Sequence, residues 1–277
     1  YPTKQSVYRE LINLNAIMNL PKGTEHFMSD LHGEYDVFYH IINNCSGVIR
    51  EKVAMLYGDE LTVYEQQELC TLIYYPREKL SILMDENKVN DEWYRNVLNQ
   101  LIQIAKLLSS KYTRSKVRKA MPVDFAYIID ELIHAQKDED DNRSVYHRQI
   151  METILSLHNG DEFLVALTDL IKRLAVDHLH ILGDIYDRGA HADKILDLLM
   201  EHHSVDIQWG NHDILWMGAF CGNPVCMALV VRNNIKYKTM SILENGYGIS
   251  LRFLLQFAVN TYCLLYTSPS PRDYAAS

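Results

Sequence analysis

A seven-residue segment, Gly-Asp-Ile-Tyr-Asp-Arg-Gly (183–189), constrains the fold of this chain more than any other. The apolar run 179–182 before it has the length and composition of a buried strand, and residues 192–201 after it have the apolar spacing of a helix. The segment is therefore predicted to be a strand-to-helix turn. Because Gly and Asp are also common in exposed turns, the motif alone leaves a purely structural role open.

Three charged side chains of this turn suit phosphate chemistry. The carboxylate of Asp184 can bind cations, and that of Asp187 can orient a neighbouring base. The planar guanidinium of Arg188 fits the oxygens of a phosphate. Ile185 and Tyr186 between them are interpreted as spacers of the turn.

Two further segments place polar residues after predicted strands. Asp30 and His32 follow the run 26–28, and Gly-Asn-His-Asp (210–213) follows the run 205–209. If residues 30–32 are extended, both side chains point to the same side and face one metal ion. Open α/β sheets bind ligands beyond the carboxyl ends of their strands, so the three segments predict one shared site.

The spacing of these segments predicts the domain organisation of an α/β protein. The segments at 183–189 and 210–213 are one crossover helix apart, whereas the gap between His32 and Asp184 contains a long helical region. We therefore predict a first part of the main domain at 1–45, a helical insertion at 46–175 and a second part at 176–262. Residues 263–277 have no apolar period and are expected to be a non-native tail.

Composition narrows the functional classes. The 277 residues carry a net charge of −9, which argues against nucleic acid as the main partner but not against a small phosphate ester. No apolar run is long enough for a membrane span. The five scattered cysteines favour a reduced, cytoplasmic setting, and Cys221 and Cys226 are interpreted as small buried hydrophobic residues.

Other polar groups receive structural interpretations. His178, His180, His202 and His203 are expected to pack or to cap secondary structure. A basic group in the helical region is expected to be a solvated face, with an anion site as the alternative. It consists of Lys106, Lys111, Arg114, Lys116, Arg118 and Lys119.

The combination Asp-x-His, Gly-Asp-x-x-Asp-Arg-Gly and Gly-Asn-His-Asp resembles the calcineurin-like metallophosphoesterase superfamily. With the helical insertion and the segment 43–50 (Asn-Asn-Cys-Ser-Gly-Val-Ile-Arg), the chain is similar to the class 3 fructose-1,6-bisphosphatases of Firmicutes. The likeness runs from about Tyr1 to Tyr262 and covers the N-terminal part of that longer family. It implies an α/β/β/α sandwich of which only the first half is present.

The resemblance also implies a metal site. Asp30 and His32 would hold one divalent cation, Asp184 would bridge to a second, and Asn211 would contact the second. Carboxylate, imidazole and amide ligands together suit manganese, with magnesium, iron or zinc as alternatives.

The resemblance further implies a catalytic set. His212 would protonate the leaving alkoxide, Asp187 would orient His212, and Arg188 would bind the phosphate. The reaction would be hydrolysis of fructose-1,6-bisphosphate to fructose-6-phosphate and phosphate in gluconeogenesis. The partner would be a small phosphorylated sugar, without nucleic acid or membrane, and homo-oligomerisation is left open.

One departure from the superfamily pattern affects these expectations. Such sites also use two histidines from later strands, but all twelve histidines here lie at or before position 212. We therefore expect an N-terminal fragment that ends near Tyr262 and binds metal poorly by itself. Two alternatives stay open: another enzyme of the superfamily (a protein Ser/Thr phosphatase or a dinucleotide polyphosphate hydrolase), and a non-catalytic metal-binding fragment. The first usually has a short link between its first two motifs and Gly-Asn-His-Glu as the third.

Overall fold

The computed structural model describes residues 1–135 and 141–262, which form two compact units. Unit 1 comprises residues 1–28, 36–181 and 202–207, and unit 2 comprises 29–35, 182–201 and the described residues from 208 onward. The predicted tail at 263–277 lies outside the described residues. The boundaries predicted at 45, 175 and 262 stay a prediction.

Unit 1 contains a small parallel sheet in the order β1-β2-β3. The strands are β1 (Glu25–Met28), β2 (His178–Ile181) and β3 (Val205–Ile207). All three lie where the sequence predicts strands, which confirms a mixed α/β chain. Residues alternate between the two faces, as strand geometry requires. In β2, Leu179 and Ile181 are fully buried, whereas His178 and His180, which alternate with them, are half-buried.

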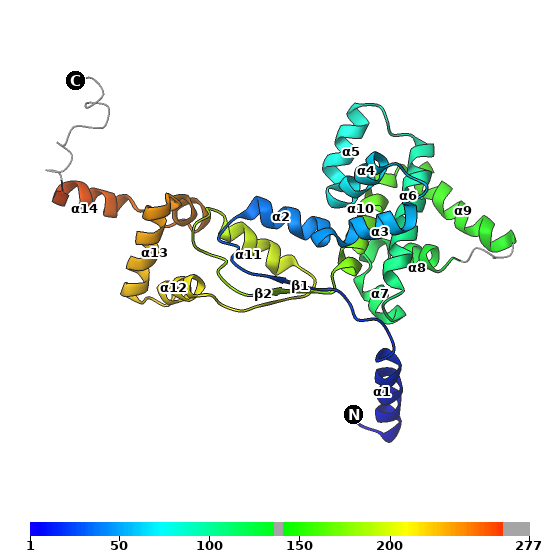
Figure 1. Ribbon diagram of the computed structural model, residues 1–277, viewed down its shortest axis with the longest axis horizontal. Coiled ribbons are helices and arrows are strands. Elements are labelled where there is room, and N and C mark those ends of the chain that lie inside the picture. Colours follow the sequence, from blue (N-terminus) through cyan, green and yellow to red (C-terminus); the bar gives the residue numbers. More distant parts are fainter. Residues whose placement is uncertain (136–140, 263–277) are drawn as a thin grey trace. The chain divides into compact units, whose positions relative to one another are not determined.

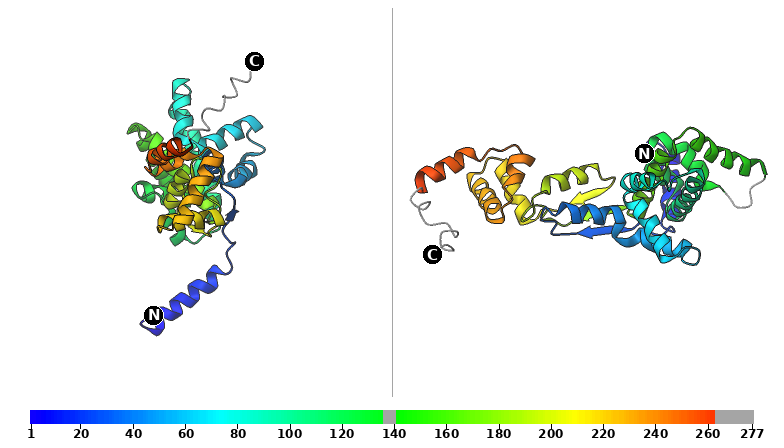
Figure 2. Two further views of the ribbon diagram at one scale, coloured as in Figure 1. Left: turned by 90° about the vertical axis from the view of Figure 1, so that its left-hand side faces the viewer. Right: turned by 90° about the horizontal axis from the view of Figure 1, so that it is seen from above.

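Helices fill almost the whole region between β1 and β2, as the sequence predicts. Helix α6 packs along α10, and α3, α4, α5, α7, α8 and α9 each contact one or both of them (Figures 1 and 2). The helices are α2 (Tyr35–Asn44), α3 (Val48–Tyr57), α4 (Val63–Tyr74), α5 (Pro76–Asp85), α6 (Asp91–Ser109), α7 (Arg114–Ala120), α8 (Ala126–His134), α9 (Asp141–Ser156) and α10 (Gly160–Ala175).

Apolar spacing explains the core of unit 1. Each of the two central helices presents a fully buried stripe at intervals of three and four residues. In α6 the stripe includes Leu101 and Ile104, and in α10 it includes Phe163, Leu167 and Leu170. One such leucine stabilises the folded state by a few kcal/mol relative to alanine.

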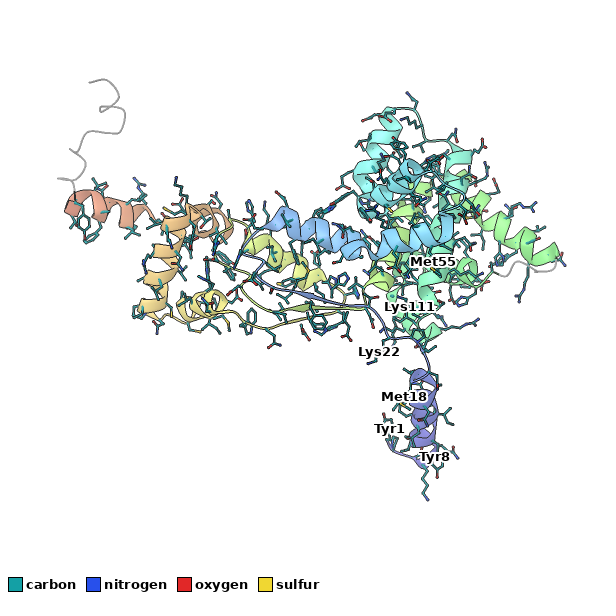
Figure 3. The ribbon with its side chains drawn as sticks, in the orientation of Figure 1. Tyr1, Tyr8, Met18, Lys22, Met55 and Lys111 are labelled. Carbon is teal, nitrogen blue, oxygen red and sulfur yellow. The ribbon has the colours of Figure 1, made fainter. Side chains whose placement is uncertain are left out.

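The first helix, α1 (Lys4–Ile17), buries none of its residues. Its apolar side chains lie exposed; Figure 3 labels Tyr8 and Met18 among them. Its N-terminus is closed by a reciprocal capping pair, in which Thr3 accepts from the backbone of Ser6 and Ser6 caps back.

Unit 2 contains α11 (Ala192–Glu201), α12 (Asn211–Phe220), α13 (Pro224–Tyr237), the π-helical turn η3 (Ile242–Gly246) and α14 (Arg252–Tyr262). Helix α12 packs against α13. A search of the described residues found no helix with the length and apolarity that a membrane crossing requires.

The cysteines differ from the sequence interpretation in one respect. Cys45 and Cys70 are buried, and Cys226 is half-buried, but Cys221 is exposed at the end of α12. The interpretation of Cys221 as a buried residue is therefore wrong. The four cysteines in the described part of the chain are free thiols.

Candidate metal centre

Main-chain hydrogen bonds hold two loops of unit 2 together. The backbone nitrogens of Asp30 and His32 donate to the carbonyl oxygens of Gly183 and Asp184, at 3.2 and 2.9 Å. The nitrogen of Gly33 donates to the carbonyl of Ile185 at 2.8 Å. The strands before these loops, β1 and β2, pair in parallel. The loop bonds follow the same pairing, so residues distant in sequence become neighbours.

Two glycines make the close approach of the loops possible. Gly183 has φ of +102°, and a Cβ there would collide with the backbone nitrogen of Gly210. A Cβ on Gly210 would in turn collide with the carboxylate of Asp184. Larger residues at either position would push the turn at 183–189 away from the segment 210–213.

Asp30, His32 and Asp184 converge within this frame. One ligand atom from each lies within 4.8 Å of the other two, and the Asp30 Oδ1–His32 Nε2 distance is 3.6 Å. Their convergence does not come from an extended segment, because β1 ends at Met28 and Asp30 and His32 have φ of +55° and +48°. The extended geometry expected for residues 30–32 is therefore wrong. Asp184 has the same left-handed backbone, a conformation that costs energy in non-glycine residues and collects at functional sites.

The side chain of Asp187 is 4% exposed. Its Oδ2 accepts a hydrogen bond from Nε of Arg188 at 3.0 Å and lies 4.0 Å from Nε2 of His32. Its Oδ1 lies 3.5 Å from Nε2 of His212 and has no hydrogen-bond partner among the described residues. A buried carboxylate oxygen in this position can orient the imidazole of His212.

The amino end of α12 faces Asp184. The backbone nitrogen of His212, in the first turn of the helix, donates to Oδ1 of Asp184 at 3.3 Å. The first turn of a helix stabilises negative charge, so it holds the carboxylate in place. Asn211 begins the helix and is exposed, and its predicted role as a metal ligand stays a prediction.

Asp213 is a positioning residue that the sequence reasoning did not include in the site. Its side chain is almost fully buried. Oδ1 accepts from the backbone nitrogens of Ile185 and Tyr186, at 3.0 and 3.1 Å, and Oδ2 accepts from Gly210 at 2.9 Å. The carboxylate thereby fastens the turn at 183–189 to the segment 210–213. An acidic residue three positions into a helix is the sequence signal that indicates such a cap.

The interpretation of Ile185 and Tyr186 as spacers is wrong. Ile185 is fully buried, and Tyr186 is 8% exposed. The ring of Tyr186 stacks on Trp216 with centroids 4.4 Å apart, and its hydroxyl bonds that of Tyr247. Burial raises the pKa of Tyr186. The side chains of Tyr186, Trp216 and Tyr247 line an apolar cavity of about 590 Å³ in unit 2. The stacking on Trp216 anchors the turn in addition to its hydrogen bonds.

The remaining polar groups from the sequence behave as local partners. His202 and His203 contact the backbone carbonyls of Ser204 and Val176, which fits their expected structural role. In the basic group, Lys116 pairs with Asp177, and Arg118 lies 3.8 Å from Asp130. These pairs favour a solvated, ion-paired face over an anion site.

The group as a whole combines two functions in one place. Among the contacts that the structure describes, the carboxylates of Asp30, Asp184 and Asp187 lie beside two imidazoles and the guanidinium of Arg188, so the local charge favours a cation. The oxygen and imidazole ligands of Asp30, His32 and Asp184 fit a divalent ion. Beside them, Asp187 and His212 form a carboxylate–imidazole pair suited to proton transfer.

Comparison with known proteins gives a single family. The model of a family described as Firmicute fructose-1,6-bisphosphatase matches residues 1–269. A class 3 fructose-1,6-bisphosphatase of Clostridium beijerinckii is 55% identical over 262 residues, which cover 95% of this chain and 39% of that protein. Proteins of the same name from Listeria innocua and Bacteroides fragilis are 53% and 51% identical, again over 95% of this chain and 40% and 39% of theirs. The chain thus spans about two fifths of the length of these relatives. No solved structure matches it.

Proposed function

Because the chain belongs to the Firmicute fructose-1,6-bisphosphatase family, we propose that it supplies part of the active site of an enzyme that hydrolyses fructose-1,6-bisphosphate to fructose-6-phosphate and phosphate. The single observation that carries this proposal is the convergence of Asp30, His32 and Asp184 beside the Asp187–His212 pair. Metal ligands next to a carboxylate–imidazole pair suit metal-assisted ester hydrolysis.

In this proposal Asp30, His32 and Asp184 hold a divalent ion, with Asn211 as a further ligand, and manganese is the preferred species. A bound ion of this kind neutralises phosphoryl charge and lowers the pKa of a bound water. The chain would adopt the first part of a metallophosphoesterase domain. The mixed α/β fold and the small parallel sheet are compatible with that assignment.

The side chains of the chain itself have separate tasks. The buried carboxylate of Asp187 faces Nε2 of His212 and keeps the ring oriented, and the opposite ring nitrogen, Nδ1, donates the proton to the leaving alkoxide. The side chain of Arg188 is 65% exposed. Within the described residues, its guanidinium bonds only its neighbour Asp187, through Nε. Its remaining N–H groups can therefore reach a phosphate. Asp213 keeps the two motifs in register.

Two alternatives receive less support. The relatives at 51–55% identity are named fructose-1,6-bisphosphatases, which does not favour a protein phosphatase or a dinucleotide polyphosphate hydrolase. A non-catalytic metal-binding role would leave the buried Asp187–His212 pair without a purpose.

A chimeric enzyme tests the proposal. Residues 1–262 replace the matching segment of the Clostridium beijerinckii relative, and phosphate release with Mn²⁺ is measured from fructose-1,6-bisphosphate, a phosphopeptide and a dinucleotide polyphosphate. We expect hydrolysis of the sugar bisphosphate at a rate near that of the unmodified relative, and its loss on Asp184→Asn. A folded chimera that prefers either of the other substrates would refute the assignment.

A further inference from the structure

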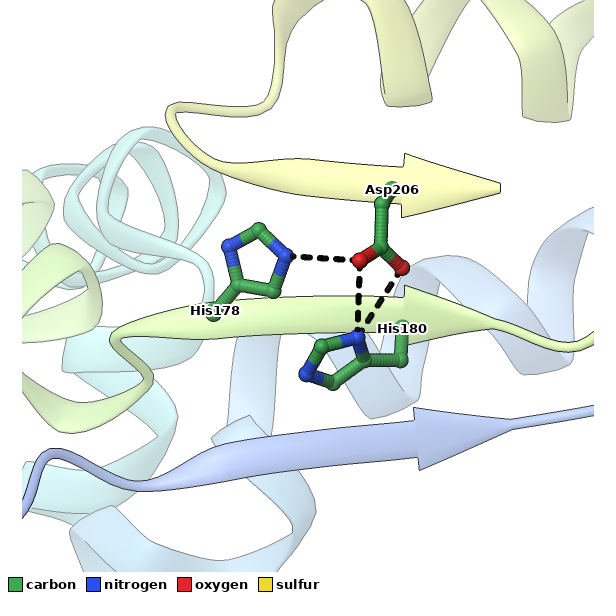
Figure 4. A group of neighbouring side chains, drawn as sticks. All are labelled: His178, His180 and Asp206. Carbon is green, nitrogen blue, oxygen red and sulfur yellow. Dashed lines mark hydrogen bonds and ion pairs between the residues drawn. The ribbon is translucent and has the colours of Figure 1, made fainter. Parts of the chain in front are cut away.

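A second group of metal-type ligands lies in unit 1, on the sheet. His178 and His180 are two residues apart on β2, so both side chains project from the same face. Asp206 is the register partner of His180 on the adjacent strand β3. Figure 4 shows the two imidazoles and the carboxylate turned toward one another. We propose that these three residues form a cation site of the zinc type, independent of the proposed phosphatase activity.

The distances fit a tetrahedral ion. Nε2 of His178 lies 3.3 Å from Oδ2 of Asp206, and Nδ1 of His180 lies 2.9 Å from Oδ1. All three ligand atoms lie within 4.8 Å of one another. Around a Zn²⁺ ion with bonds of about 2.0–2.1 Å, neighbouring ligand atoms are about 3.3 Å apart. Small rotations of the side chains therefore bring three ligands to three corners of a tetrahedron.

The outer nitrogens of the two imidazoles each face an oxygen atom of another side chain. Nδ1 of His178 lies 2.6 Å from the hydroxyl oxygen of Ser204. Nε2 of His180 is buried, makes no hydrogen bond within the described residues, and lies 3.7 Å from a carboxylate oxygen of Glu25 on β1. Metal-binding histidines usually donate their second N–H to a hydroxyl, carbonyl or carboxylate in this way, which fixes the ring and the tautomer.

These outer partners determine what the inner nitrogens can do. If each ring keeps its proton on the outer nitrogen, two lone pairs face the carboxylate of Asp206, and this arrangement is repulsive without a cation. A metal ion removes the repulsion by binding all three groups. The competing explanation is that the inner nitrogens carry protons and form simple ion pairs with Asp206.

Ligand chemistry selects the ion. Two imidazoles and one carboxylate suit zinc, whereas the carboxylate-rich group at Asp30, His32 and Asp184 suits manganese. An ion at His178, His180 and Asp206 would connect β2 to β3 across their pairing. We therefore assign it a structural role, with a fourth position open to water.

The test uses the 277-residue chain carrying Asp184→Asn, which disables the first ligand group. After chelator treatment, Zn²⁺ binding is measured by titration calorimetry, and Co²⁺ serves as a visible-absorption probe of a tetrahedral site. We expect one tight Zn²⁺ equivalent, a tetrahedral Co²⁺ spectrum and a higher melting temperature with Zn²⁺. Adding His178→Gln and His180→Gln should remove all three signals.

Two milder variants guard against loss of the fold. Ser204→Ala leaves the three ligands in place and should weaken Zn²⁺ binding about 10-fold by releasing the ring of His178. His158→Asn changes an exposed histidine of the same unit and should leave the affinity unchanged. Absence of a tight Zn²⁺ equivalent in the Asp184→Asn chain would overturn the site. A tight Zn²⁺ equivalent that persists in the folded His178→Gln, His180→Gln variant would overturn the site too. The two histidines would then form only protonated ion pairs with Asp206.

Discussion

Oδ1 of Asp187 lies 3.5 Å from Nε2 of His212, and the side chain of Asp187 is 4% exposed. A residue of the turn at 183–189 and a residue in the first turn of α12 thus form a carboxylate–imidazole pair whose carboxylate is buried. The carboxylate is also bonded to Arg188 and lies within 4.0 Å of His32. Asp187 therefore links the proposed acid, the proposed phosphate-binding residue and one proposed metal ligand.

This link predicts the effect of Asp187→Asn. The amide has nearly the same shape but lacks the negative charge of the carboxylate that faces the imidazole of His212. We expect kcat of the chimeric enzyme to fall about 10²–10⁴-fold, the range typical for loss of acid–base catalysis, with little change in KM. Steady-state phosphate release measures both constants. A kcat within a few-fold of the parent value would exclude the orienting role of Asp187.

Asp184→Asn should weaken metal binding by this chain. Removing the charge leaves Asp30 and His32 as the nearest ligands, so we expect the Mn²⁺ dissociation constant to rise at least about 10-fold. Electron paramagnetic resonance of free Mn²⁺ provides the measurement. Asp59→Asn, at an exposed position of unit 1, is the matched control and should have no effect. Equal affinities of the two variants would contradict the ligand role of Asp184.

Asp213→Ala should destabilise unit 2. Three backbone N–H groups lose their acceptor at a position that is 1% exposed, and we expect a loss of about 2–4 kcal/mol in the free energy of unfolding. Asp213→Asn keeps one acceptor oxygen and should cost less. Urea titrations followed by circular dichroism give the comparison. If alanine costs no more than asparagine, the carboxylate does not fasten the two motifs.

Leu167→Ala should destabilise unit 1. Leu167 is fully buried in α10, and its truncation leaves a cavity that costs about 2–5 kcal/mol. Leu157 is 71% exposed, so Leu157→Ala is the matched control and should change stability by less than about 0.5 kcal/mol. Similar midpoints of urea unfolding for both variants would be inconsistent with the described core.

Acid should destabilise unit 1 through His202. Burial, followed by the neighbouring His203, lowers the pKa of His202 to about 4 from its ordinary value of 6.5. The unfolded state therefore binds the proton more readily, and stability falls as the pH drops from 6.5 toward 4. Between pH 7 and pH 5 the loss is up to about 2 kcal/mol. In His202→Gln this part of the loss should disappear. Urea titrations at both pH values measure the free energy of unfolding. An equal loss in the variant and the parent would argue against a buried neutral imidazole at His202.

The sequence alone determined the secondary structure and the identity of the polar groups. Apolar periodicity placed the three strands and the helices between them, because burial of one face requires those periods. The motifs around Asp30, Asp184 and His212 indicated a shared site at strand ends, because parallel strands bring their carboxyl ends together.

Only the tertiary structure decided how those groups meet. The left-handed backbone of Asp30 and His32, the burial of Tyr186 and the three bonds of Asp213 depend on partners from other loops. The same holds for His178 and His180, whose shared carboxylate comes from the next strand. Local periodicity reports which face of an element is apolar. It carries no information on which distant side chain fills the space beside it, because that choice depends on packing between segments far apart in the chain.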